Sequence, residues 1–113
     1  MRSEFDLQQT VLNAVQRRGY ARGNYATEAR QQTLKALEEL GEVARYVFDG
    51  RAVPVAELAD VAIPLLVLAA LQDDDLLAAI LEKVQRDVER GVRREEYAAV
   101  GRPETNPFTP QDV

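Results

Sequence analysis

The sequence predicts an all-α fold, a bundle of four to five helices that shares its core in a homo-oligomer. Three observations support this fold class: apolar residues recur every three or four positions, segments rich in glycine or proline separate these stretches, and no stretch alternates as a strand does. The chain has 113 residues, of which 46% are hydrophobic and 29% charged, as is typical of a globular protein. We expect one domain over residues 1–100 and an irregular tail with three prolines over residues 101–113.

The first two expected helices are separated by a loop. A capping-box-like start and helical apolar spacing predict a helix from about Glu4 to Arg18 that stops at Gly19. Residues 19–26 contain two glycines and an asparagine without any period, which predicts a loop. Thr27 is expected to cap the second helix, which ends at Asp49-Gly50.

Two further helices follow. Pro54 suits the first turn of a third helix that ends near Leu71, and Pro64 is expected to kink or widen it because proline has no amide hydrogen to donate. The acids at 73–75 cap a fourth helix, and residues 93–100 are expected to add a short fifth one. The third helix is apolar on nearly all sides, which predicts a homodimer or homotetramer that covers it.

The composition excludes several kinds of chemistry. With no cysteine and no histidine, the chain has no disulfide, no thiolate nucleophile and no imidazole ligand for a metal. A net charge of −5 argues against nucleic acid or an anionic membrane as the partner. The longest apolar run, Val61–Leu71, is well short of the roughly 20 residues of a membrane span, and the N-terminus does not resemble a secretory signal. We therefore expect a cytoplasmic protein.

Acidic residues on the second and third helices form two pairs with helical spacing. Glu39 and Glu42 are three residues apart, as are Glu57 and Asp60, so each pair lies on one helix face. If these helices pack antiparallel, the pairs can face each other and hold a hard cation such as Mg²⁺ or Mn²⁺. The alternative is that these acids form an ordinary solvated face. Gly41 within the acidic segment predicts a close approach of backbone or ligand there.

The acidic motifs resemble those of a known family. Glu-Glu-x-x-Glu at 38–42 is separated by fourteen residues from Glu-x-x-Asp at 57–60, with Thr-Leu-Lys-Ala-Leu before it at 33–37 and an apolar helix after it. This arrangement resembles the MazG-like all-α nucleoside triphosphate pyrophosphohydrolases. The resemblance implies a hydrolase that cleaves between the α and β phosphates and releases a nucleoside monophosphate and pyrophosphate.

The resemblance also implies roles for individual residues. The Mg²⁺ ligands, with Mn²⁺ as a possible substitute, would be Glu39, Glu42, Glu57 and Asp60. Glu38 would bind a further metal or orient the attacking water as a general base. Basic residues on the fourth helix would neutralise the triphosphate, the candidates being Lys83, Arg86 and Arg90.

Other candidate binding residues have alternative interpretations. Lys35 can reach a phosphate, although an ion pair with Glu38 or Glu39 on the same helix is the favoured alternative. Asn24, with Tyr20 and Tyr25, can contact a nucleobase, or these can be ordinary loop residues.

Three functions are therefore open. The leading one is a Mg²⁺-dependent nucleoside triphosphate pyrophosphohydrolase. The second is a non-catalytic helical module that binds a nucleotide or a protein, and the third is a structural helical oligomer with solvated acids. The sequence leaves open which base and sugar are preferred.

Overall fold

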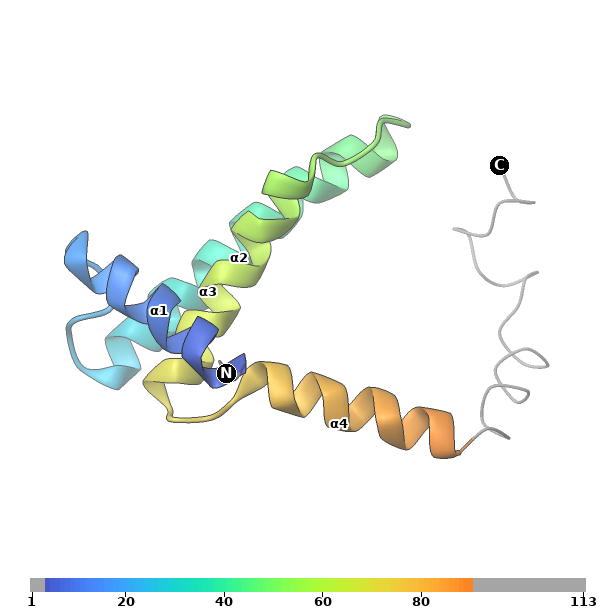
Figure 1. Cartoon of the computed structure of the whole chain (residues 1–113). Helices are drawn as coiled ribbons and strands as arrows, with labels where there is room; N and C mark the ends of the chain where they lie inside the picture. Colours follow the sequence, from blue (N-terminus) through green and yellow to red (C-terminus); the bar gives the residue numbers. More distant parts are fainter. Residues whose placement is uncertain (1–3, 91–113) are drawn as a thin grey trace. The chain divides into compact units, whose positions relative to one another are not determined.

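The structure, a computed structural model, describes residues 4–90 and is all-α (Figure 1). It has four helices and no strand within these residues: α1 (Glu4–Arg17), α2 (Tyr25–Phe48), α3 (Val55–Leu71) and α4 (Leu76–Glu89). The predicted all-α class is confirmed, and the helix bounds agree closely with those expected. The short fifth helix expected at 93–100 and the tail at 101–113 lie outside the described residues.

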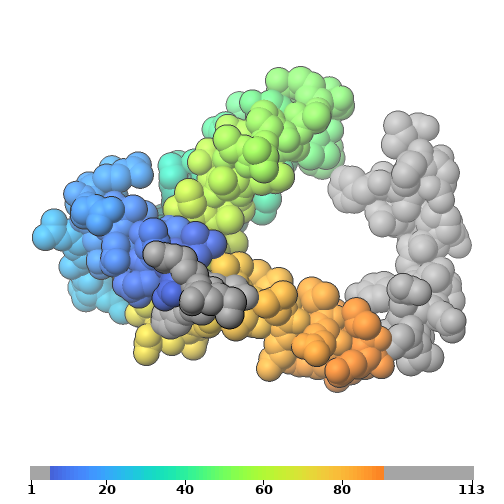
Figure 2. Space-filling view, viewed as in Figure 1, coloured from blue at the N-terminus to red at the C-terminus, as the bar shows by residue number. Residues whose placement is uncertain are grey.

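The chain divides after Ala78 into two compact units, so that α4 begins in the first unit and continues into the second. In the first unit α3 packs against both α1 and α2. The turn at residues 49–54 returns the chain, so that α2 and α3 run antiparallel as expected and form one continuous surface (Figure 2). This arrangement brings the acidic segments of α2 and α3 to the same end of the helix pair.

The loop between α1 and α2 is held by local hydrogen bonds. Gly19 has a φ of +93°, a conformation that favours glycine, and α1 ends just before it as predicted. The cap of α2 is Asn24, whose Oδ1 accepts a hydrogen bond of 3.0 Å from the Thr27 backbone N–H. The predicted Thr27 cap was therefore wrong. The helix starts three residues earlier than a Thr27 cap would place it, and Thr27 supplies the N–H that donates to the Asn24 side chain.

Prolines and acids mark the ends of α3 and α4 largely as expected. Pro54 is the residue immediately before α3, and Pro64 lies buried inside that helix. Because Pro64 lacks an amide hydrogen, the Asp60 carbonyl has no donor one turn ahead. The Asp75 Oδ1 accepts a 3.0 Å hydrogen bond from the Ala78 N–H, which confirms the acidic cap of α4.

The core of the first unit is small and joins α1, the following loop and α3. It consists of Leu12, Ala21 and Val67, which are 8%, 2% and 0% exposed. Ala21 has a φ of +55°, uncommon for a residue with a side chain, and its carbonyl accepts a 2.9 Å hydrogen bond from Gln16 Nε2. The buried methyl group and this hydrogen bond keep the loop against the core.

Gln8 attaches α1 to the start of α4. Its side chain is fully buried, its Nε2 donates to the Asp74 carbonyl, and its Oε1 accepts a 3.0 Å hydrogen bond from the Leu76 N–H. The amide therefore satisfies two backbone groups at the α3–α4 connection that the helices leave unpaired. This polar residue inside the core has a structural role.

The four helices differ from membrane spans in length or in apolar character. Among the described residues, no single helix is both long and apolar enough to cross a membrane. Within residues 4–90, the pair α3 and α4, taken together across the break between them, reaches the required length and composition.

Candidate metal centre and adjoining pocket

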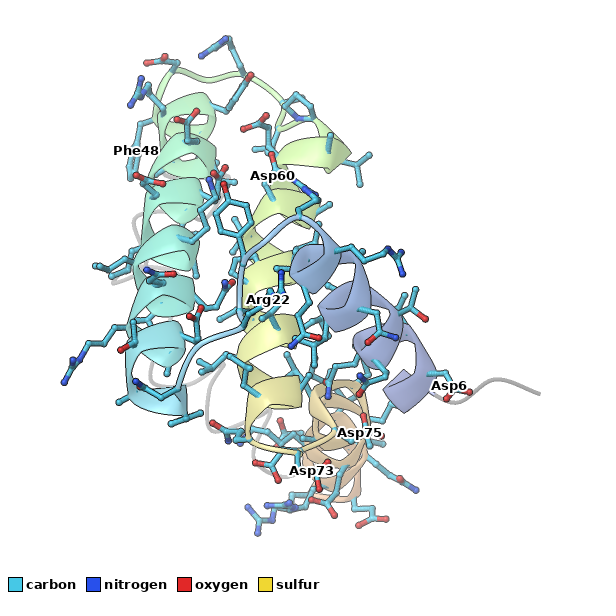
Figure 3. All side chains as sticks on the ribbon, turned by 90° about the vertical axis from the view of Figure 1, so that its left-hand side faces the viewer. Asp6, Arg22, Phe48, Asp60, Asp73 and Asp75 are labelled. Carbon is cyan, nitrogen blue, oxygen red and sulfur yellow. The ribbon has the colours of Figure 1, made fainter. Side chains whose placement is uncertain are left out.

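Three carboxylates from α2 and α3 converge at one place. Glu39, Glu57 and Asp60 each offer an oxygen, and these oxygens lie within 4.8 Å of one another. Glu39 comes from the middle of α2, whereas Glu57 and Asp60 occupy the first turns of α3. Figure 3 shows Asp60 at the end of α3 near the turn that follows α2. The sequence-based expectation that acids of the two helices meet is confirmed for these three residues.

The other two predicted acids lie outside this group. Glu42 is exposed and is not one of the three converging residues. It is three residues from Glu39, which rotates it by about 60° around the helix, away from the Glu39 direction. Glu38 is rotated further, by about 100°, and its side chain is 74% exposed. The structure therefore brings together three of the four predicted ligands, and the role of Glu42 stays a prediction.

Lys35 lies beside the acidic triad, defined as Glu39, Glu57 and Asp60. Its Nζ is 3.0 Å from Glu39 Oε2 and 3.8 Å from Glu38 Oε1. The Glu39 side chain is only 16% exposed, so this ion pair is partly shielded from solvent on the acid's side. The intrahelical ion pair weighed in the sequence analysis is confirmed. The hydrogen bond from Lys35 to Glu39, then the charge of Glu39, raise the pKa of Lys35, with smaller contributions from Glu38 and Asp60.

We expect the pKa of Lys35 to lie above that of an ordinary lysine. Because the folded-state pKa is raised, the stabilisation from this pair is complete below the ordinary lysine pKa and is lost as the pH rises through the folded-state value. NMR titration of the lysine ε-methylene signals would measure it, and Glu39→Gln should return the pKa toward the ordinary value. An unchanged titration in that variant would show that the pair does not form.

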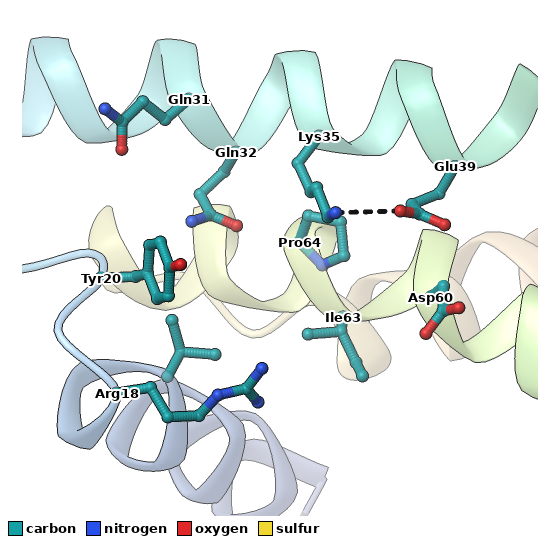
Figure 4. Close-up of a pocket in the computed structure, with 10 residues that line it drawn as sticks. Arg18, Tyr20, Gln31, Gln32, Lys35, Glu39, Asp60, Ile63 and Pro64 are labelled. Carbon is teal, nitrogen blue, oxygen red and sulfur yellow. Dashed lines mark ion pairs between the residues drawn. The ribbon is translucent and has the colours of Figure 1, made fainter.

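A pocket of about 470 Å³ adjoins the triad (Figure 4). Glu39 and Asp60 belong to its wall, so the metal-capable acids open onto it. The remaining lining residues come from α1, the following loop, α2 and α3, namely Val15, Arg18, Tyr20, Gln31, Gln32, Lys35, Ile63 and Pro64. This volume is within the range of small-molecule pockets. Its wall carries acids, two cations, an aromatic ring and two amides.

Arg18 and Gln32 are pocket residues that sequence reasoning missed. Arg18 is exposed, its guanidinium extends into the pocket in Figure 4, and it makes no ion pair with another described residue. Gln32 is 9% exposed and has no hydrogen-bond partner among the described residues. Gln32 lies seven residues before Glu39, two helical turns, and this spacing is the one signal that places it on the same face.

The remaining predicted binding residues lie in different places. Asn24 caps α2 and is not among the residues that line the pocket, although Tyr20 of the same loop is. Lys83 and Arg86 are exposed on α4 in the second compact unit, where Arg86 pairs with Glu82 at 2.9 Å. Their part in substrate binding remains a prediction.

Gly41 has no close neighbour among the described residues. A Cβ atom at this position would meet no other atom within 4 Å. No backbone among the described residues therefore approaches Gly41, and the approach of a ligand stays a prediction.

Within the described residues, the fold and site define an all-α protein with an acidic triad, two members of which line a pocket. Compared with protein-family models, curated proteins and solved structures, the chain matches none of them. The resemblance to MazG-like enzymes therefore remains a hypothesis based on the acidic motifs.

Proposed function

We propose that this protein is a Mg²⁺-dependent nucleoside triphosphate pyrophosphohydrolase. The observation that carries the proposal is the meeting of Glu39, Glu57 and Asp60, of which Glu39 and Asp60 line a pocket of about 470 Å³. Acid clusters are common on protein surfaces. This one adjoins a pocket that also carries two cations and an aromatic ring, which complement phosphates and a base.

The chemistry of the triad fits Mg²⁺ or Mn²⁺. Both ions prefer oxygen ligands, and Mg²⁺ usually binds a few carboxylates and completes its shell with water and substrate phosphates. Three carboxylates with oxygens within 4.8 Å of one another can supply such a partial shell. When bound, the ion would polarise the phosphoryl group and lower the pKa of a coordinated water.

The residues of the chain then have distinct roles. Glu39, Glu57 and Asp60 hold the ion, and the exposed Glu38 is our candidate to accept the proton of the attacking water. Lys35 compensates the charge of Glu39 in the structure and also lines the pocket. A cation that shares Glu39 would weaken this ion pair, and the Lys35 ammonium would then be available to a phosphate oxygen.

Pyrophosphate release tests the proposal. The purified protein would be incubated with a panel of ribo- and deoxyribonucleoside triphosphates, with Mg²⁺, with Mn²⁺ or with a chelator. We expect turnover of at least one nucleotide that depends on the metal. No turnover across the panel with either ion would contradict the proposed function.

We further propose that a second copy of the chain covers the outer side of α2. Leu34, Leu37 and Phe48 recur with helical spacing and are 64%, 61% and 74% exposed, and Gly41 lies between them. Figure 3 shows Phe48 on the side of α2 away from α3. An apolar stripe opposite the buried face supports a second helix-packing surface, and a glycine without neighbours lets another helix approach closely.

A charge introduced into this stripe should disrupt the assembly. We expect the wild-type protein to have the molar mass of a dimer or a larger oligomer, and Leu37→Lys to have that of a monomer, because a buried unpaired ammonium is strongly unfavourable. Light scattering coupled to size-exclusion chromatography would measure both masses. Gln9→Lys, on the exposed side of α1, is the matched control and should leave the mass unchanged. A monomeric wild-type protein would contradict the proposal.

A further inference from the structure

The pocket wall carries a side-chain amide, that of Gln32, which the chemistry of the triad does not use. Gln32 is 9% exposed, lines the pocket, and has no hydrogen-bond partner among the described residues. Figure 4 shows its side chain extending from α2 into the pocket, with Tyr20 near it across the cavity. A side-chain amide has both donors and an acceptor, and those of Gln32 make no hydrogen bond with another described residue. The amide is therefore placed to bind an occupant of the pocket.

The chemistry of an amide narrows the class of that occupant. Gln32 presents N–H donors and a carbonyl acceptor side by side. A phosphate or a carboxylate offers acceptors alone and would leave the Gln32 oxygen unpaired, whereas a cation would leave its N–H groups unpaired. The edge of a nucleobase offers a donor beside an acceptor and satisfies both.

The neighbours of Gln32 suit the rest of such a ligand. Tyr20 supplies an aromatic ring on which a base can stack. Arg18 adds a guanidinium that has no ion pair with another described residue, and Lys35 adds an ammonium on the side toward Glu39. The pocket thus has an amide and an aromatic ring for a base, and the Lys35 ammonium beside Glu39 for a phosphate.

We propose that Gln32 recognises the donor–acceptor edge of a nucleobase held against Tyr20, and so contributes to base selection. This inference rests on the proposed function in one respect, which is that the phosphates of the ligand extend toward the triad. Binding of the base itself requires neither the metal nor turnover. The Gln32 amide can turn either its oxygen or its nitrogen toward the ligand, so it does not select one base by itself. Gln31, which also lines the pocket, and the loop between α1 and α2 would contribute to base selection.

Binding without metal tests the inference separately from hydrolysis. Isothermal titration calorimetry would compare the monophosphates of adenosine, guanosine, cytidine and uridine with ribose 5-phosphate, in the presence of a chelator. We expect the wild-type protein to bind at least one monophosphate about tenfold more tightly than ribose 5-phosphate, and Gln32→Met to lose that difference. Methionine has a similar length but cannot make these hydrogen bonds.

Two controls keep the result interpretable. Gln9→Met makes the same chemical change on the exposed face of α1, outside the pocket lining, and should bind as the wild type does. Thermal unfolding of Gln32→Met verifies that the variant is folded, and Gln32→Glu, which removes the donors, provides a second variant of similar size. Equal binding of ribose 5-phosphate and all monophosphates, or undiminished base preference in folded Gln32→Met, would overturn the inference. An absence of pyrophosphate release would contradict the proposed function and leave this result standing.

Discussion

Replacing Glu57 by glutamine is expected to lower kcat/KM for pyrophosphate release by at least about a hundredfold. Glu57 is one of the three residues whose carboxylate oxygens lie within 4.8 Å of one another, and it is half-buried in the first turn of α3. The amide keeps the size of the side chain but removes its charge, so the triad holds the cation less tightly and phosphates are less well neutralised. Initial rates measured over a range of Mg²⁺ concentrations would show both effects.

A matched variant distinguishes a loss at the triad from a general effect of removing an acid. Glu89→Gln makes the same change on an exposed part of α4 and should keep the wild-type rate. Asp60→Asn should behave like Glu57→Gln, since Asp60 also belongs to the triad and lines the pocket. If folded Glu57→Gln turned over nucleotides at the wild-type rate, the triad would not be the metal centre of the reaction.

Replacing Leu12 by alanine is expected to destabilise the first unit by about 3 kcal/mol. Leu12 packs with Ala21 and Val67 in a small core, so its removal leaves a cavity that few neighbours can fill. For a domain of this size the loss corresponds to a melting temperature lower by roughly 10–20 °C. Circular dichroism during thermal and urea unfolding would measure it.

The control for this variant lies on the same helix. Leu7 is 51% exposed, so Leu7→Ala removes the same atoms from a side chain that is much less buried. We therefore expect a much smaller loss of stability. Equal destabilisation by both substitutions would show that the core does not lie between α1, the following loop and α3.

The helices were predictable because each has a strong local signal. Apolar spacing places α2 and α3, and Gly19 and the acids at 73–75 mark helix ends through backbone conformation and capping. The start of α2 was misplaced because Asn24 and Thr27 are both good caps, and the sequence alone does not say which one accepts the hydrogen bond.

The candidate site was predictable in part. The spacing of acids on two antiparallel helices was enough to expect Glu39 near Glu57 and Asp60. That Glu42 lies outside this group could not be predicted, because the motif gives spacing but not the rotation of α2 about its own axis, which packing on α3 determines. Arg18 and Gln32 were missed because their role depends on how α1 and α2 meet around the pocket, a tertiary arrangement with no local pattern.

Direct titration with Mn²⁺ tests the metal centre without any assumption about the substrate. Electron paramagnetic resonance reports free Mn²⁺, so the bound fraction can be followed for the wild-type protein, Glu57→Gln and Asp60→Asn, with Glu89→Gln as the control. We expect saturable binding in the wild type and the control, and about tenfold or more weaker binding in both triad variants. Mn²⁺ binding that is absent from the wild type, or equally strong in all four proteins, would contradict a metal centre at Glu39, Glu57 and Asp60.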